Sequence, residues 1–473
     1  MKYAVAIGLE VHVQLKTKSK MFCGCETSFG DVPNTHVCPV CLGYPGAMPV
    51  MNGEAIRYTV MAGLMIGSKI SGYSKFDRKS YFYPDMPKNY QITQYDKPLC
   101  IGGAVEIDAA NGRRAIHITR IHLEEDVAKN MHFANSSGID FNRAGIPLME
   151  IVTEPEIESP DEAMKFLLEL KRIMEYAGVS NCNLEEGNVR CDVNCSIRPA
   201  GSDVLGTKAE LKNLNTFKGV YHALEYEIHR QVELVDHGGR ILQETRRWDP
   251  DTGVTHSMRS KEEAHDYRYF PEPDLLPVIL PPDVVAEWKS RLPELPHQRI
   301  ERFISQYGLP PYDAGVLAAD KGVADYFESA ARHCSSFKGL SNWIMTEVLR
   351  HLSETGKQIG DICVPPPALA ELVGMVDAGA VNNTVAKEVL NAMFEDGGSP
   401  ADIVRAKGLS QVSDEDSLSE LVESAIAANA KSVEAYRGGK AAALQSLVGH
   451  VMKASRGKAN AAKVQDILRR KLG

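Results

Sequence analysis

The sequence lacks the features of several large protein classes. No apolar run approaches the roughly 18–20 residues that a membrane-spanning helix needs. Ten cysteines in 473 residues are too few for a disulfide scaffold, so we expect thiols that bind metal or lie buried in a reducing compartment. Because Glu10 interrupts the first apolar residues, we expect no signal peptide, no membrane association and a cytosolic location.

Familiar nucleotide-binding and nucleophile motifs are absent too. The sequence has neither a Gly-x-x-x-x-Gly-Lys-Ser/Thr phosphate loop nor a Gly-x-Gly-x-x-Gly fingerprint. The paired serines Ser136 and Ser137 come without an accompanying lysine pattern, so we interpret them as part of a turn rather than as a glutaminase nucleophile. If a nucleotide binds, its site must be of a less common, sheet-lined kind.

Composition and charge indicate a globular protein with an unusual end. The apolar fraction of 44% and the charged fraction of 24% are ordinary for a folded chain, and the length predicts two to four domains. The net charge of −9 conceals a basic end, because residues 424–473 contain ten lysines and arginines but only the acids Glu434 and Asp466. A basic end on an acidic body indicates binding of an anionic polymer, and a solvated helical tail is the alternative.

The pattern along the chain predicts an α+β protein with three modules. Residues 1–292 read as a mixed or antiparallel sheet domain with few long helices, and a proline-rich stretch from Pro271 to Pro296 ends it. Helical spacing then predicts an all-α domain over residues 293–400 and a small basic all-α domain over residues 401–473. Single helices are expected at residues 297–307, 314–333, 340–355 and 433–455.

The first strand is clearly patterned. Apolar residues occupy every odd position from Tyr3 to Leu15, while Glu10 and His12 fall on the even face. Side chains two apart in a strand point the same way, about 6.6–7 Å from each other. The small residues before Glu10 on this face leave room for a ligand. A half-exposed strand whose polar face meets water is the alternative.

Further strands carry charged residues in similar patterns. Glu150 lies within the apolar run 146–152, where a lone carboxylate is costly to bury unless it is paired or bound to metal, and an exposed edge strand is the alternative. A strand at residues 115–123 runs into the acids 124–126. Two later alternating segments add Arg190, Asp192, Lys208 and Glu210, and these faces together could line a cleft for Mg²⁺ and nucleotide phosphates.

Four cysteines form two close pairs. Cys23 and Cys25 are separated from Cys38 and Cys41 by a loop of twelve residues that contains Gly30 and Pro33. Two tight pairs of thiolates suit tetrahedral Zn²⁺, and four protein ligands leave no open position for catalysis. We therefore predict a structural zinc site in the loop 23–41.

Taken together, the runs resemble the B subunit family of the tRNA-dependent amidotransferases, the GatB/GatE family. The resemblance covers nearly the whole chain and is carried by segments at residues 7–15, 75–85, 122–126, 140–148, 150–155, 187–194, 212–215, 243–246, 266–274 and 447–458. It implies one subunit of a heterotrimeric carbon–nitrogen ligase, in which an amidase (A) subunit releases ammonia from glutamine and a small C subunit completes the assembly.

The resemblance also implies a reaction and its residues. This subunit would use ATP and Mg²⁺ to phosphorylate the side-chain carboxylate of Glu-tRNA(Gln) or Asp-tRNA(Asn), and ammonia would then displace phosphate. The fold would be of the glutamine synthetase type. Carried over by motif, the metal ligands would be Glu10, His12, Glu125 and Glu150. The tRNA backbone would be contacted by Lys453, Arg456, Lys458, Arg469, Arg470 and Lys471.

Two other functions stay open from the sequence. The first is a self-contained ligase that joins a small acid to free ammonia, against which the basic tail argues. The second is a zinc-stabilised RNA-binding scaffold whose carboxylates are structural.

Overall fold

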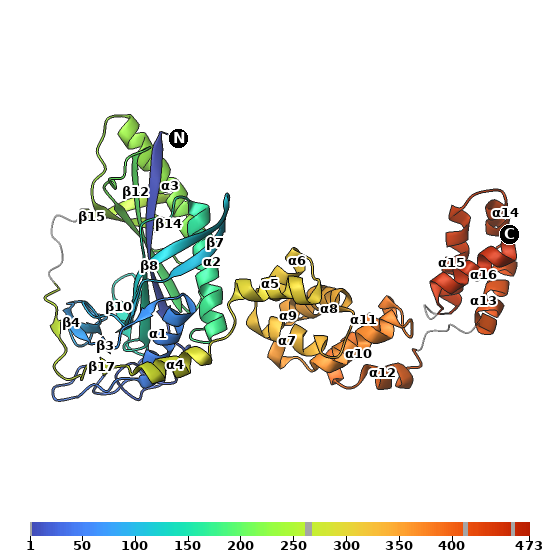
Figure 1. The fold of residues 1–473 in the computed structure, drawn as a ribbon, viewed down its shortest axis with the longest axis horizontal. Coiled ribbons are helices and arrows are strands. Elements are labelled where there is room, and N and C mark those ends of the chain that lie inside the picture. The colour runs from blue at the N-terminus through green and yellow to red at the C-terminus, as the bar shows by residue number, and fades with distance from the viewer. Residues whose placement is uncertain (1, 261–266, 410–414, 456–458) are drawn as a thin grey trace. The chain divides into compact units, whose positions relative to one another are not determined.

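The computed structural model describes residues 2–260, 267–409, 415–455 and 459–473 (Figure 1). The chain divides into two compact units, Met1–Leu295 and Pro296–Gly473. The first unit combines a large mixed sheet with helices, and the second is helical throughout its described residues. The predicted α+β class with a helical C-terminal region is therefore confirmed.

The first unit is built on a 13-stranded sheet. Ten of its strands follow the order β15-β14-β13-β12-β1-β11-β8-β5-β4-β16, while β6 and β7 also pair with β8, and β2 pairs with β6. Neighbouring strands are antiparallel except for β13 and β14. The strands are β1 (Tyr3–Gln14), β2 (Lys69–Ile70), β4 (Asp77–Ser80), β5 (Tyr90–Thr93), β6 (Cys100–Ile101), β7 (Ala104–Ala109), β8 (Gly112–Glu125), β11 (Pro147–Thr153), β12 (Val189–Pro199), β13 (Ala209–Lys212), β14 (Glu244–Asp249), β15 (Val254–Ser260) and β16 (Phe270–Pro271).

Two small sheets complete the β structure. The hairpin of β9 (Lys129–His132) and β10 (Ser137–Asp140) turns at residues 133–136, so only the first half of the turn predicted at residues 135–138 is a turn and the rest belongs to β10. Strand β3 (Tyr73–Ser74) pairs with β17 (Val278–Ile279).

The side chains of the central strand β1 alternate between an apolar and a polar face of the sheet. Its odd residues, such as Leu9 and Val11, are buried in the hydrophobic core, as their alternation predicts. Among its even residues, Glu10, His12 and Gln14 are partly accessible on the other face. Because β11 and β12 flank β1 on its two sides, residues from four strands meet on this polar face.

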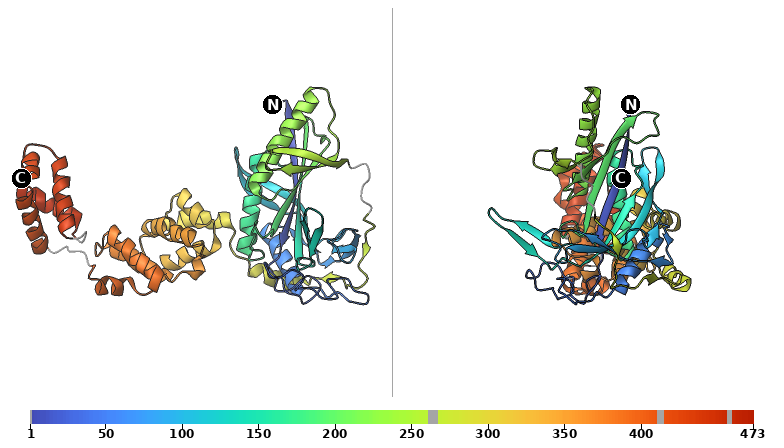
Figure 2. Two further views of the ribbon diagram at one scale, coloured as in Figure 1. Left: turned by 180° about the vertical axis from the view of Figure 1, so that it is seen from behind. Right: turned by 90° about the vertical axis from the view of Figure 1, so that its left-hand side faces the viewer.

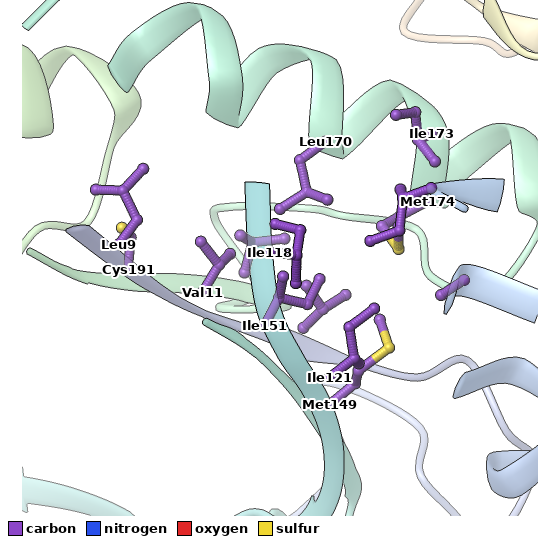
Figure 3. Close-up of a cluster of buried hydrophobic side chains, with 14 of the residues drawn as sticks. Leu9, Val11, Ile118, Ile121, Met149, Ile151, Leu170, Ile173, Met174 and Cys191 are labelled. Carbon is purple, nitrogen blue, oxygen red and sulfur yellow. The ribbon is translucent and has the colours of Figure 1, made fainter. Parts of the chain in front are cut away.

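Helices cover the apolar face of the sheet (Figures 2 and 3). Leu170 and Met174 of one helix pack in the same buried cluster as Val11 of the central strand and Ile151. That helix begins after the capping side chain of Ser159 and ends at Gly178, whose φ of 68° suits glycine. The covering helices are α1 (Gly53–Met65), α2 (Pro160–Ala177) and α3 (Phe217–Asp236), and α4 (Pro282–Ser290) follows near the end of the unit.

The first unit contains three helices longer than twelve residues beside its many strands. Helices α1, α2 and α3 have 13, 18 and 20 residues. In α2 and α3, charged residues interrupt the apolar spacing in the sequence, so only the inward stripe carries the helical period.

The second unit contains two buried hydrophobic clusters, each with its own helices. One extends from Phe303 to Val404 and the other from Leu418 to Leu472. The first cluster thus continues past residue 400, where the sequence places a boundary. Its helices are α5 (Pro296–Tyr307), α6 (Pro311–Leu317), α7 (Lys321–Ala331), α8 (Phe337–Trp343), a π-helical turn (Ile344–Val348), α9 (Leu349–Thr355), a 3₁₀ turn (Ile359–Asp361), α10 (Pro366–Asp377), α11 (Asn383–Asp396) and α12 (Pro400–Ala406).

The second cluster is formed by α13 (Glu415–Ala428), α14 (Ala430–Arg437), α15 (Ala442–Ala454) and α16 (Ala461–Leu472). Two predicted helices are each divided in two. Asp320 caps a new helix within residues 314–333, and Gly438 and Gly439 interrupt residues 433–455. Among the described residues, no helix combines the length and apolar character needed to cross a membrane.

Candidate functional site

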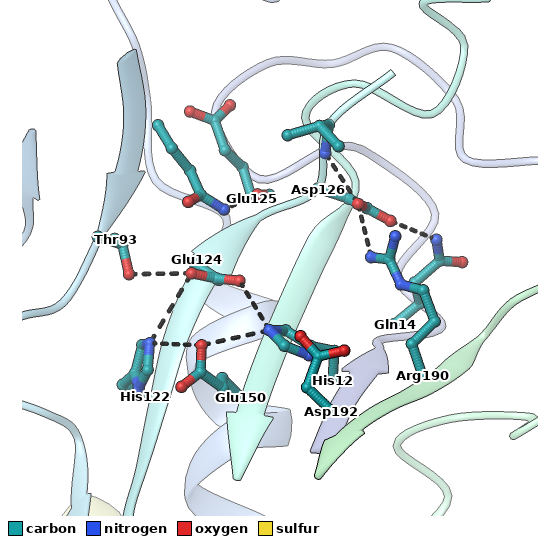
Figure 4. A network of polar contacts seen from close by, with 12 residues as sticks. His12, Gln14, Thr93, His122, Glu124, Glu125, Asp126, Glu150, Arg190 and Asp192 are labelled. Carbon is teal, nitrogen blue, oxygen red and sulfur yellow. Dashed lines mark hydrogen bonds and ion pairs between the residues drawn. The ribbon is translucent and has the colours of Figure 1, made fainter. Parts of the chain in front are cut away.

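A row of histidine and glutamate side chains crosses the polar face of the sheet (Figure 4). His12 of β1 lies opposite Glu150 of β11, which lies opposite His122 of β8. One carboxylate oxygen of Glu150 lies 3.3 Å from Nε2 of His12 and 3.5 Å from Nε2 of His122. The antiparallel register alone brings these three residues, distant in sequence, onto one face.

Glu124, two residues after His122 on β8 and on the same face, completes this cluster. Its carboxylate lies 3.9 Å from Nε2 of His12 and accepts a hydrogen bond of 3.1 Å from Thr93. One ligand atom from each of His12, Glu124 and Glu150 lies within 4.8 Å of the others. Two carboxylates and an imidazole are a suitable donor set for a divalent cation, so these residues fit a metal site. We call them the His12–Glu124–Glu150 cluster.

The charges in this cluster support one another. Burial opposes the charged form of His12, but the carboxylates of Glu150 and Glu124 raise its pKa above the ordinary value. Burial also opposes ionised Glu150, yet the nearby His122, His12 and Lys79 hold the pKa of that carboxyl well below its usual range. Glu150 is therefore an anion at neutral pH and can act as a metal ligand.

Glu10 occupies the same face but belongs to a neighbouring group. Its carboxylate accepts a hydrogen bond of 3.0 Å from Asn194, and its backbone lies opposite Asp192 of β12. Lys212 contacts both Asp192 and Glu210, the latter at 3.1 Å. Lys208 is exposed just before β13. The structure thus gathers three of the predicted residues, Glu10, Asp192 and Glu210, beside the cluster.

Glu125 does not join the cluster. It points to the opposite face of the sheet, where the ammonium of Lys88 contacts its carboxylate and the Ile92 amide donates to it at 2.9 Å. The reason is the two-residue period of a strand: if His122 and Glu124 face the cluster, Glu125 must face away. The structure places Glu124 where the sequence predicts Glu125.

Arg190 lies between the cluster and a buried carboxylate. It donates to Asp126 at 2.7 Å, and Gln14 donates to the other oxygen of the same carboxylate at 2.7 Å. Arg143 approaches Asp126 to 3.8 Å. Burial would raise the pKa of Asp126, but the two guanidinium groups hold it below its ordinary value.

A cavity of about 990 Å³ opens beside this network. Arg190, Gln14 and Arg143 line it, together with Lys16 and Lys129. The wall also carries four carboxylates, those of Asp31, Asp140, Glu185 and Glu186, so it offers both cations and anions to a ligand. Its size is suited to a ligand as large as a nucleotide.

The four predicted zinc ligands come together. The sulfur atoms of Cys23, Cys25, Cys38 and Cys41 lie within 4.8 Å of one another. A hydrogen bond from the Cys23 thiol lowers the pKa of Cys41 to about 4. Beside them the fully buried Lys20 donates to the carbonyls of His36 at 2.7 Å and Phe141 at 3.1 Å and lies 3.7 Å from the Cys41 sulfur. A cation at this position offsets the negative charge of thiolate ligands, so the residues fit Zn²⁺.

The predicted tRNA-contacting residues that the structure describes lie in the last turns of two helices. Lys453 is in the last turn of α15, and Arg469, Arg470 and Lys471 are in the last turn of α16. All four are exposed. Arg456 and Lys458 lie outside the described residues.

Comparison with known proteins decides the family. A family model described as the GatB/GatE catalytic domain matches residues 5–286, and one described as the GatB domain matches residues 325–472. The chain belongs to the GatB/GatE family. It is 52% identical to a protein of Thermoanaerobacter sp. (strain X514) over 474 residues, 51% identical to one of Caldicellulosiruptor saccharolyticus over 477 residues, and 50% identical to one of Trichlorobacter lovleyi over 473 residues. Each match covers at least 99% of both chains, and each relative is named as the B subunit of an aspartyl/glutamyl-tRNA(Asn/Gln) amidotransferase.

Sequence reasoning missed three residues of this GatB/GatE site. Glu124, His122 and Asp126 belong to the run His122–Asp126, in which the motif indicates Glu125 alone. Strand parity holds the missing signal: the polar His122 fixes the face of residue 124, and the apolar Leu123 fixes that of residue 125. Asp126 lies just after the end of β8, so the two-residue period of the strand does not predict where its side chain points.

We predict that Asp126→Asn destabilises the sheet unit by about 2 kcal/mol at pH 7. This is below the ~3–5 kcal/mol of a fully buried pair, because the side chain of Arg190 is still 37% exposed. Since the pKa of Asp126 is depressed in the folded state, its contribution is present above about pH 4 and lost as the pH falls through the folded value. Urea unfolding at pH 7 and pH 3.5 tests this, and a variant with wild-type stability at pH 7 would contradict the network.

Proposed function

We propose that this chain is the subunit of a tRNA-dependent amidotransferase that activates the side-chain carboxylate of Glu-tRNA(Gln), Asp-tRNA(Asn) or both. An amidase (A) subunit would supply ammonia from glutamine, and a small C subunit would complete the complex. The relatives, which are named as B subunits and match along the full chain, support this role. Because translation takes place in the cytoplasm, we expect the enzyme to act there.

The His12–Glu124–Glu150 cluster is the observation that carries the proposal. A carboxylate is a poor acyl donor until one of its oxygens becomes a good leaving group, and phosphorylation by ATP achieves this. Bound at the cluster, Mg²⁺ would offset the charge of the phosphates during transfer. Glu124 and Glu150 would hold the ion as anions, and His122 would orient Glu150 through their 3.5 Å contact.

The neighbouring groups have matching roles in the proposal. Glu10, Asp192 and Glu210 would form a second acidic site, at which Lys212 now neutralises two carboxylates. Arg190 and the cavity beside it would receive the phosphates of ATP. A polar face with a candidate metal-binding cluster, on a mostly antiparallel sheet, is also the basis on which we propose a fold of the glutamine synthetase type.

The two other functions differ from this one in what they require. A ligase for a small free acid would need no tRNA, and a scaffold would not need carboxylates that bind metal. Turnover of ATP that depends on misacylated tRNA separates the first from the proposal. Amide formation that survives neutralisation of the cluster would favour the second.

We predict that Glu124→Gln lowers amide formation about a hundred-fold or more at fixed Mg²⁺, because an amide is a weaker ligand for a hard cation. Glu125→Gln is the matched control, since the same change one residue away faces the other side of the sheet. Rates measured against Mg²⁺ concentration should show a higher half-saturating concentration for the first variant alone. The assignment fails if Glu125→Gln, and not Glu124→Gln, shifts this concentration.

We predict that Cys38→Ser lowers the zinc content of the purified protein well below one ion per chain, because three thiolates hold the ion less tightly than four. Cys363→Ser is the control, since this exposed cysteine lies outside the cluster. Metal analysis after dialysis measures both. Wild-type protein that retains no zinc after growth with the metal would contradict the site.

We predict that removing residues 410–473 weakens tRNA binding and flattens its salt dependence, because phosphate contacts in the tail are lost. The cut leaves Val404 within the core of the preceding helices. The double variant Arg469→Gln, Arg470→Gln in the full chain should reduce the salt slope by up to about two, while ATP affinity stays unchanged. An unchanged slope in the truncated enzyme would show that the tail does not contact the tRNA.

A further inference from the structure

Tyrosines from two distant segments gather at one edge of the large sheet. Strand β16 pairs with β4, so that Phe270 lies opposite Arg78, and the Ser80 amide donates to the Tyr267 carbonyl at 2.8 Å. Arg78 also forms an ion pair of 2.7 Å with the buried Glu272. Two segments that support the family resemblance, residues 75–85 and 266–274, thus pair with each other in their described residues, and neither contributes a side chain to the His12–Glu124–Glu150 cluster.

The aromatic rings in this region are ordered against one another. The rings of Tyr95 and Tyr269 are stacked with centroids 4.1 Å apart and planes inclined by 9°. Tyr267 meets Tyr269 at 5.9 Å, and the ammonium of Lys79 lies 4.9 Å from the Tyr267 ring. The Tyr95 amide donates to Asp77 at 3.2 Å, which ties the chain just after β5 to β4. Despite the stack, Tyr95 is 59% exposed.

These rings lie close to the His12–Glu124–Glu150 cluster. Burial raises the pKa of Tyr269, and the carboxylates of Glu124 and Glu150 raise it further, so the phenol lies within their electrostatic reach. Lys79 in turn helps to hold the pKa of Glu150 low. The strand register agrees, because Thr93, which donates to Glu124, lies opposite Asp77 of the strand that carries Lys79.

The proposed reaction requires a site for a nucleobase at this distance. The carboxylate to be activated belongs to an amino acid esterified to the ribose of the 3′-terminal adenosine, so only the ribose and a short aminoacyl stem separate it from adenine. A tRNA end bound at the cluster must therefore place its adenine nearby. Stacking on an aromatic ring is the usual way in which proteins hold an unpaired RNA base.

We propose that Tyr95, supported from behind by Tyr269, stacks on the adenine of the 3′-terminal adenosine of the aminoacyl-tRNA. The inference rests on the proposed function and adds a binding residue to it. Tyr95 favours a tRNA end over ATP because its ring is exposed at the edge of the sheet, whereas the cavity beside Arg190 offers the phosphate-binding cations. Every tRNA ends in the same nucleotide, so a platform without base-specific hydrogen bonds is sufficient.

A thermodynamic cycle in the assembled amidotransferase tests this. Affinity is measured for tRNA and for the same tRNA lacking its terminal adenosine, with wild type and Tyr95→Ala. We expect wild type to lose about five- to hundred-fold in affinity when the adenosine is removed, and Tyr95→Ala to lose a similar factor with intact tRNA. For the shortened tRNA the two proteins should bind equally, because both changes remove the same contact.

Further variants distinguish the contribution of the Tyr95 ring from that of its hydroxyl, of other exposed tyrosines and of protein stability. Tyr95→Phe should bind like wild type, and Tyr73→Ala, which removes another exposed tyrosine of the same unit, should leave both affinities unchanged. If Tyr95→Ala melts at a lower temperature, Tyr95→Leu gives the same cycle while preserving contact with Tyr269.

Each other outcome overturns the inference. Additive losses in the cycle would show that Tyr95 does not contact the adenosine, and a raised dissociation constant for ATP alone would assign the platform to the nucleotide. Failure of the proposed function is distinguishable, because wild type would then form no amide from misacylated tRNA. Wild-type amide formation combined with additive losses would overturn only the role of Tyr95.

Discussion

The alternation of side chains along antiparallel strands is the constraint on which this structure depends. In β1 it sends Leu9 and Val11 into the core and His12 onto the polar face. Register then carries the alternation to the neighbouring strands, so that Glu150 and His122 lie opposite His12 in turn. The helices that bury the apolar face thereby hold the polar face rigid, and the cluster needs no loop to assemble it.

The sequence predicts much of this arrangement because the strand period is short and visible. The central strand, Glu150 within its apolar run and the paired cysteines are all recognisable from spacing. The choice between Glu124 and Glu125 required the face of β8, which the alternation of His122 and Leu123 indicates but the motif alone does not. Helices α2 and α3 carry many charged residues, which obscure their apolar period, and the division at Gly438 comes from a pair of glycines that apolar periodicity alone does not register.

The loop that holds the cysteines is also connected to the polar face. Lys20 links the loop to the Phe141 carbonyl, and Asn142 accepts from the His36 amide at 2.8 Å. The next residue, Arg143, donates to the carbonyls of Val127 and Ala128 and approaches Asp126. Order in the cysteine loop therefore supports the wall of the cavity beside the cluster, although the four cysteines leave no position for chemistry.

On our proposal, the polar face of the sheet activates a carboxylate by directing the transfer of phosphate from ATP to it. The most direct test uses glutamyl-tRNA whose side-chain carboxylate is labelled with ¹⁸O, in the assembled enzyme with ATP and glutamine. If the carboxylate is phosphorylated, the oxygen that bridges to phosphorus leaves with the phosphate, and mass spectrometry finds ¹⁸O in the inorganic phosphate released with amide formation. Unlabelled phosphate alongside full amide formation would contradict the account.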